Sequence, residues 1–86
     1  LFSLEGRVAV VTGGSRGIGE MIATGFLAAG AERVYITARK VAVVQETAAR
    51  LGERCIPIAG DISNLAGIEA LVAELSARED KLDILV

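Results

Sequence analysis

The sequence predicts a single α/β domain built on a parallel β-sheet with helices on both faces. Two observations support this class: short β-branched runs alternate with amphipathic helical patterns along the whole chain, and 86 residues allow no more than one domain. Strands and helices that alternate in this way are joined by right-handed crossovers, which make neighbouring strands parallel. The expected sheet has the strand order 3-2-1-4, and the chain ends in the fourth strand.

The first half of the chain predicts a strand, a helix and a second strand. Residues 7–12 form a largely β-branched run that stops at glycines, as a strand buried on both faces does. Residues 18–29 have helical spacing, and residues 34–37 are a second short strand. One face of the helix carries three apolar residues at four-residue spacing, namely Ile18, Ile22 and Phe26.

The second half predicts a helix over 41–51, a strand over 54–58, a third helix and a fourth strand over 83–86. Pro57 has no N–H to donate, which favours an edge position for its strand. Ser63 is the expected N-cap of the third helix. The apolar stripe of that helix consists of Ile68, Leu71, Val72 and Leu75.

The two ends of the sequence indicate an excerpt of a longer chain. The sequence begins without methionine and stops inside its fourth strand. We therefore expect residues 1–86 to be the N-terminal part of one domain whose C-terminal part is absent. Ile84, Leu85 and Val86 would then form an unprotected apolar sheet edge. The isolated chain is expected to be poorly stable and to associate, which a sharp, reversible, concentration-independent thermal transition would contradict.

Composition and charge exclude several function classes. Hydrophobic residues make up 52% and charged residues 23% of the chain, as in a globular protein. The net charge of −2 gives no general attraction to nucleic acid or an anionic membrane. One cysteine excludes an internal disulfide. The absence of histidine argues against a Ser-His or Cys-His dyad and against a zinc cluster, so no metal site is expected. Without a signal peptide or an apolar run near ~18 residues, a cytoplasmic location without a membrane span is expected.

A glycine-rich turn at residues 12–19, Thr-Gly-Gly-Ser-Arg-Gly-Ile-Gly, joins the first strand to the first helix. Glycine lets the backbone approach a ligand closely, and the free N–H groups of the helix start attract an anion such as a pyrophosphate. The alternative is a structural turn that binds nothing. However, four glycines in seven residues weaken the local fold, and a purely structural turn rarely needs so many. The candidate cofactor-binding residues of the turn are Gly13, Ser15, Arg16, Gly17, Ile18 and Gly19.

The spacing Thr-Gly-x-x-x-Gly-x-Gly resembles that of the short-chain dehydrogenase/reductase family. Gly60-Asp61-Ile62 resembles the acidic adenine-contacting turn of that family, and residues 82–86 resemble its fourth strand. The amino-acid sequence of the whole chain is most similar to 3-ketoacyl reductase-like members, including those linked to rhamnolipid synthesis. The resemblance implies a Rossmann-type sheet, a nicotinamide cofactor, and adenine contacts from Asp61 and the Ile62 backbone. The alternative role of Asp61 is turn formation or capping ahead of Ser63.

The end of the second strand predicts NADP(H) rather than NAD(H). An acidic residue there binds the ribose 2′-hydroxyl of NAD, but this strand ends in Thr37-Ala38-Arg39-Lys40. Arg39 and Arg16 together can grip a 2′-phosphate with charge-assisted hydrogen bonds, as in the NADP-preferring members that this chain resembles. The alternative is that both arginines are ordinary surface charges. Lys40 is expected to be solvated, and Ser15 either bonds a phosphate or ribose or only forms the turn.

The resemblance implies hydride transfer between a nicotinamide and a carbonyl or alcohol, in a 3-oxoacyl-type reductase that is a homo-oligomer. The family uses a Ser, and a Tyr followed four residues later by a Lys, for the acid–base chemistry. No such pair is present, because the only tyrosine is Tyr35 and Arg39 stands four residues after it. We therefore expect a structural Tyr35, no catalytic residue in this chain, and no turnover by the chain alone. A Rossmann-type protein that senses or binds the cofactor without catalysis is the alternative function.

Overall fold

The computed structural model describes residues 3–13, 17–79 and 81–86. Four strands and three helices alternate along these residues, as expected. In chain order they are β1 (Val8–Thr12), α1 (Gly17–Ala28), β2 (Arg33–Ala38), α2 (Val41–Leu51), β3 (Cys55–Ala59), α3 (Leu65–Arg78) and β4 (Ile84–Leu85). The strands pair in parallel in the order β3-β2-β1-β4, which confirms the predicted α/β class and sheet order.

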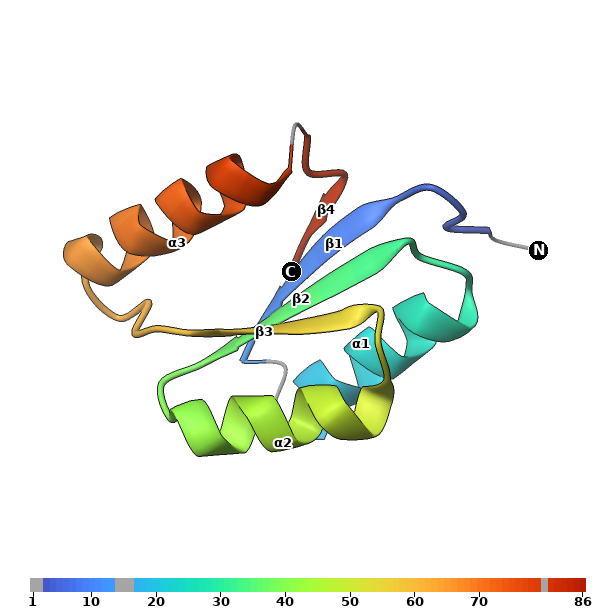
Figure 1. Ribbon diagram of the computed structural model, residues 1–86, viewed down its shortest axis with the longest axis horizontal. Coiled ribbons are helices and arrows are strands. Elements are labelled where there is room, and N and C mark those ends of the chain that lie inside the picture. Colours follow the sequence, from blue (N-terminus) through green and yellow to red (C-terminus); the bar gives the residue numbers. More distant parts are fainter. Residues whose placement is uncertain (1–2, 14–16, 80) are drawn as a thin grey trace.

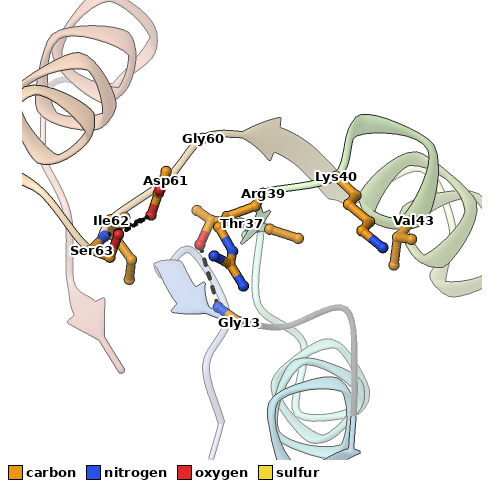
Figure 2. A pocket seen from close by; sticks show the side chains of 10 residues that line it. Gly13, Thr37, Arg39, Lys40, Val43, Gly60, Asp61, Ile62 and Ser63 are labelled. Atoms are coloured by element: carbon orange, nitrogen blue, oxygen red, sulfur yellow. Dashed lines mark hydrogen bonds between the residues drawn. The ribbon is translucent and has the colours of Figure 1, made fainter.

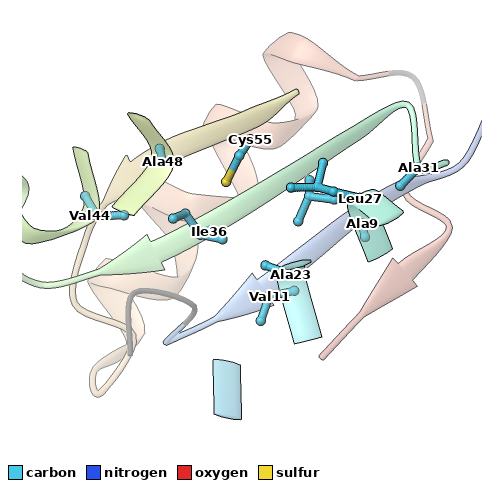
Figure 3. Close-up of a cluster of buried hydrophobic side chains, with 10 residues drawn as sticks. Ala9, Val11, Ala23, Leu27, Ala31, Ile36, Val44, Ala48 and Cys55 are labelled. Atoms are coloured by element: carbon cyan, nitrogen blue, oxygen red, sulfur yellow. The ribbon is translucent and has the colours of Figure 1, made fainter. Parts of the chain in front are cut away.

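The sheet lies between two helical layers, with α1 and α2 on one face and α3 on the other (Figure 1). The larger core fills the space between the sheet and the α1–α2 layer and is aliphatic apart from Cys55 (Figure 3). Cys55 is buried, and this burial raises the pKa of its thiol to about 11. The smaller core on the α3 face holds Val8, Val10, Tyr35 and Ile58.

The buried face of α1 differs from the predicted one. Ala23 and Leu27 are its buried residues, whereas Ile18 is 76% exposed. Ile22 and Phe26 are only partly buried at the margin of the core. The physical reason is that Ala23, which has a small side chain, allows the helix to lie close to the sheet, while Ile18 in the first turn lies beyond the core.

The start of α3 corrects a second prediction. Asn64, and not Ser63, is the N-cap, because the side-chain oxygen of Asn64 accepts the backbone N–H of Gly67 at 2.8 Å. Ser63 lies one residue too early to reach that N–H and donates to Asp61 instead. Leu71 and Leu75 pack on the smaller core, whereas Val72 of the predicted stripe is 56% exposed. The helix thus contacts the sheet with only half of its apolar stripe.

The two sheet edges agree with the sequence prediction. Pro57 lies in β3 at one edge. At the other edge, β4 pairs with β1, and Leu85 is 67% exposed. Asp83 stabilises the contact between β4 and β1, because one of its carboxylate oxygens accepts a hydrogen bond from the N–H of Val8 at 2.9 Å.

A polar cluster joins the end of α3 to the start of β2. The carboxylate of Glu79 accepts from the guanidinium of Arg33 at 2.8 Å and from the hydroxyl of Tyr35 at 2.6 Å. Tyr35 is buried in the smaller core, which agrees with the structural role expected for it. The hydrogen bonds from Arg33, and then from Tyr35, hold the pKa of Glu79 below its ordinary value of 4.5.

This cluster predicts a loss of stability in acid. A carboxyl group whose pKa is lowered by folding stabilises the native state above its ordinary pKa, and that contribution disappears as the pH falls through the lowered value. Glu79→Gln, made in a full-length protein that carries residues 1–86, should therefore reduce the loss of stability against urea between pH 7 and pH 3. Glu74→Gln, which removes an exposed pair with Arg78 on the same helix, is the control and should leave the pH profile unchanged. Identical pH profiles for the natural chain and Glu79→Gln would contradict this role.

Candidate functional site

A cavity of about 720 Å³ opens at the carboxyl edge of the sheet. Parallel α/β sheets bind ligands at this edge, and the volume lies within the usual range for small-molecule sites, about 300–1,000 Å³. The walls come from the ends of β1, β2 and β3 and from the chain entering α2 and α3 (Figure 2). The lining residues are Gly13, Thr37, Ala38, Arg39, Lys40, Val43, Gly60, Asp61, Ile62 and Ser63.

Two glycines of the predicted turn have backbone conformations that favour glycine. Gly13 follows β1 with φ of 69°, and Gly17 opens α1 with φ of 50°. Apart from chain neighbours, no atom of the described residues lies within 4 Å of the position that a Cβ would take at Gly13 or Gly17. The first N–H groups of α1 have no partner within the helix, so the end of α1 beside β1 can attract an anion.

Arg39 follows directly after β2 and lines the cavity. Figure 2 shows its guanidinium extended toward Gly13, whereas the ammonium of Lys40 lies near Val43 of α2. No acidic residue stands at the end of this strand, where Ala38 is the last residue. The positive charge of Arg39 also contributes to lowering the pKa of Asp61.

Asp61 forms a turn across the cavity from Arg39 (Figure 2). Its Oδ1 accepts the backbone N–H of Ser63 at 2.9 Å and the hydroxyl of Ser63 at 2.6 Å. These two bonds, with the side-chain bond as the larger cause, hold the pKa of Asp61 below its ordinary value, so the carboxylate is ionised at neutral pH. Both bonds end on Oδ1, so Asp61 forms the turn with one of its two carboxylate oxygens.

Gly67 is a close-packed glycine that supports this turn. It lies in the first turn of α3, and its backbone lies so close to Asp61 that a Cβ there would overlap the carbonyl oxygen of Asp61. Glycine is therefore required at position 67 for lack of space, and not for backbone conformation. The contact fixes the position of the Asp61 turn relative to α3.

The structure brings together part of the predicted site. Gly13, Arg39, Asp61 and Ile62 line the cavity. Gly17, Ile18 and Gly19 form the first turn of α1 and are not among the lining residues. Ser15 and Arg16 lie outside the described residues.

Sequence reasoning missed several residues of the site. Thr37 is one of the two buried polar side chains in the described part of the chain, and its hydroxyl accepts the N–H of Gly13 at 3.3 Å. A polar residue at the end of an apolar strand was the available signal for Thr37. Gly67 and Val43 had no such signal, because their closeness to the site depends on how the helices pack.

Among residues 3–13, 17–79 and 81–86, no cluster of three or more histidine, cysteine, aspartate or glutamate side chains is placed to hold a metal ion. Within the same ranges, every helix is too short or too polar to cross a membrane.

The chain belongs to the short chain dehydrogenase family, whose model matches residues 7–86. It is 52% identical over 87 residues to the rhamnolipids biosynthesis 3-oxoacyl-[acyl-carrier-protein] reductase of Pseudomonas aeruginosa, covering 99% of this chain and 34% of the relative. It is 40% identical to the sorbitol dehydrogenase of Cereibacter sphaeroides, covering 96% of this chain and 32% of that one. The chain thus spans about a third of the length of the curated relatives it matches.

Solved structures show the same fold. The RhlG/NADP active-site complex of Pseudomonas aeruginosa matches with a TM-score of 0.93 and 51% identity, over 98% of this chain and 33% of that one. The L-sorbose reductase of Gluconobacter frateurii, complexed with NADPH and L-sorbose, matches with a TM-score of 0.90 and 36% identity, over 98% of this chain and 33% of that one.

Proposed function

We propose that residues 1–86 form the NADP(H)-binding part of a short-chain oxidoreductase that reduces a carbonyl or oxidises an alcohol. The observation that carries this proposal is Arg39, a cation at the cavity on the end of β2, where an NAD-binding unit has an acid. The NADP and NADPH complexes of the two structural relatives support the same choice of cofactor.

The turn after β1 would bind the pyrophosphate of the cofactor. Gly13 and Gly17 leave open space where other residues carry a Cβ, and the start of α1 supplies N–H groups and a positive dipole end. We propose that Ser15, Arg16, Ile18 and Gly19 complete this phosphate site. Together with Arg16, Arg39 would hold the 2′-phosphate, because two guanidiniums can donate to its oxygens from two sides.

The turn after β3 would bind the adenine. The Oδ2 of Asp61 is the acceptor available for the exocyclic amino group, and Ile62 lies beside it in the cavity wall. Asp61 is ionised at neutral pH, which makes it an acceptor there. The turn-forming and ligand-binding roles of Asp61 use different oxygens and are compatible.

The bound cofactor would supply the hydride, and these residues would hold and orient it. We propose that residues 1–86 are the N-terminal part of one domain and that the acid–base residues lie outside them. Tyr35, the single tyrosine, is buried against α3 and is not among the residues that line the cavity. The substrate class that we propose is a 3-oxoacyl group, supported by the 52% identity to the Pseudomonas aeruginosa reductase.

The test is an equilibrium titration of a chimera in which residues 1–86 replace the matching third of that reductase. We expect NADPH to bind more tightly than NADH by about 10- to 150-fold, the effect of one hydrogen bond to a charged group of about 1.5–3 kcal/mol. Adenosine 2′-monophosphate should compete with NADPH better than adenosine 5′-monophosphate does. A folded chimera that binds NADH as tightly as NADPH would overturn the cofactor assignment.

A further inference from the structure

Thr37 connects the glycine turn to the strand that carries Arg39. It lies in β2 directly beside Thr12, the last residue of β1, and its side chain is buried. Its Oγ1 accepts the backbone N–H of Gly13 at 3.3 Å, as the dashed line in Figure 2 shows. Thr37 is also part of the wall of the large cavity.

The N–H of Gly13 needs this side chain because the chain leaves the sheet at that residue. The parallel pairing of β1 with β2 ends at Thr12 and Thr37. Gly13 lies beyond this pairing, and its N–H donates to a side chain instead of a strand carbonyl. A partly buried N–H without an acceptor is unfavourable, and the hydroxyl of Thr37 takes the place of the missing backbone acceptor.

We propose that Thr37 is a positioning residue that fixes the phosphate-binding turn relative to Arg39. This inference rests on the proposed function, since it needs the turn to bind the pyrophosphate and Arg39 to bind the 2′-phosphate. Thr37 precedes Arg39 by two residues on the same segment, and its hydroxyl holds the first peptide group of the turn. One side chain therefore sets the separation of the two phosphate subsites that a single dinucleotide has to span.

This role predicts that removing the Thr37 hydroxyl weakens the binding of a ligand that spans both phosphate subsites more than the binding of a shorter ligand. A ligand that reaches the turn only through Arg16, as a nucleoside 2′-phosphate would, depends less on where the turn lies than NADPH, whose pyrophosphate would also bind the N–H groups of the turn. Thr37→Val keeps the shape and the strand propensity of the side chain but removes the acceptor. Thr37→Ser keeps the acceptor and removes a methyl group.

The experiment compares both variants in the chimera by titration with NADPH and with adenosine 2′-monophosphate. We expect Thr37→Val to weaken NADPH binding by about two- to tenfold, the effect of one neutral hydrogen bond. Adenosine 2′-monophosphate, which would contact the turn only through Arg16, should lose less affinity in Thr37→Val than NADPH does, and Thr37→Ser should retain NADPH affinity. Thr47→Val removes the hydroxyl of the other buried threonine, which lies in α2, and should leave the ratio of the two affinities unchanged.

A second measurement needs no ligand. Hydrogen exchange of the Gly13 amide should be faster in Thr37→Val than in the parent chimera and in Thr37→Ser. Unchanged exchange at Gly13, unchanged NADPH affinity, or an equal loss of both ligands in Thr37→Val would overturn the positioning role. Failure of the parent chimera to bind either ligand overturns the proposed function instead, and the positioning role with it, so the two failures are distinguishable.

Discussion

Arg39→Asp is expected to lower the affinity of the chimera for NADPH by about 10- to 150-fold, since one charge-assisted contact of about 1.5–3 kcal/mol is lost. The new carboxylate should repel the 2′-phosphate and accept from the ribose 2′-hydroxyl of NADH, so the preference between the cofactors should reverse. The structural reason is that Arg39 lines the cavity beyond Ala38, with no acid at the strand end. Titration with both cofactors measures the ratio of the affinities.

Lys40→Asp is the matched control, because it changes the charge equally at the next position. Lys40 also lines the cavity, but its ammonium lies near Val43 of α2 (Figure 2). A lysine ammonium is also a point charge that lacks the planar fork of a guanidinium. We expect a smaller change in the ratio of the affinities than for Arg39→Asp. Equal changes in the two variants would show that charge alone, without a specific contact at Arg39, sets the cofactor preference.

Gly67→Ala is expected to destabilise the fold by about 1–3 kcal/mol, as overpacked substitutions do. The added Cβ would overlap the carbonyl oxygen of Asp61, so the Asp61 turn and the first turn of α3 have to separate. The Asn64 cap, which bonds the N–H of Gly67, lies in the same contact. Urea denaturation of the chimera measures the stability, and the affinity for NADPH should fall with it because Asp61 lines the cavity.

Gly25→Ala provides a control of the opposite sign. Gly25 lies inside α1 and has no positive φ. Apart from its own helix backbone, no atom in the described part of the chain lies within 4 Å of its Cβ position. Alanine there should stabilise the helix by about 0.5–1 kcal/mol through its lower conformational entropy in the unfolded chain. If Gly67→Ala also stabilised the protein, helix propensity would dominate at both sites and the close approach to Asp61 would have no energetic consequence.

The errors of sequence reasoning have a common cause. The spacing of Ile18, Ile22 and Phe26 correctly predicted a helix, but the small residue Ala23 is what approaches the sheet. The predicted N-cap was Ser63, whereas the observed one is Asn64, because the apolar spacing does not reveal a shift of one residue in the start of the helix. Periodicity reports which element forms, and it reports less accurately where that element begins and which part of it touches its neighbour.

The sequence by itself determined the order of the elements, the parallel sheet and the position of the glycine turn. It also identified Arg39 and Asp61, which both line the cavity. Such features follow from local rules, because apolar spacing defines strands and helices and the carboxyl ends of parallel strands share one edge.

Tertiary structure alone decided the contacts between segments distant in the sequence. The bond from Gly13 to Thr37 joins residues 24 positions apart. The approach of Gly67 to the carbonyl of Asp61 is local in sequence, but it depends on how the chain turns from β3 into α3. Such contacts depend on separations of a few tenths of an ångström between packed elements, and no pattern along the chain encodes them. The sequence identifies the glycine turn and the strand ends as separate features. These contacts decide whether the features form a single site for a dinucleotide.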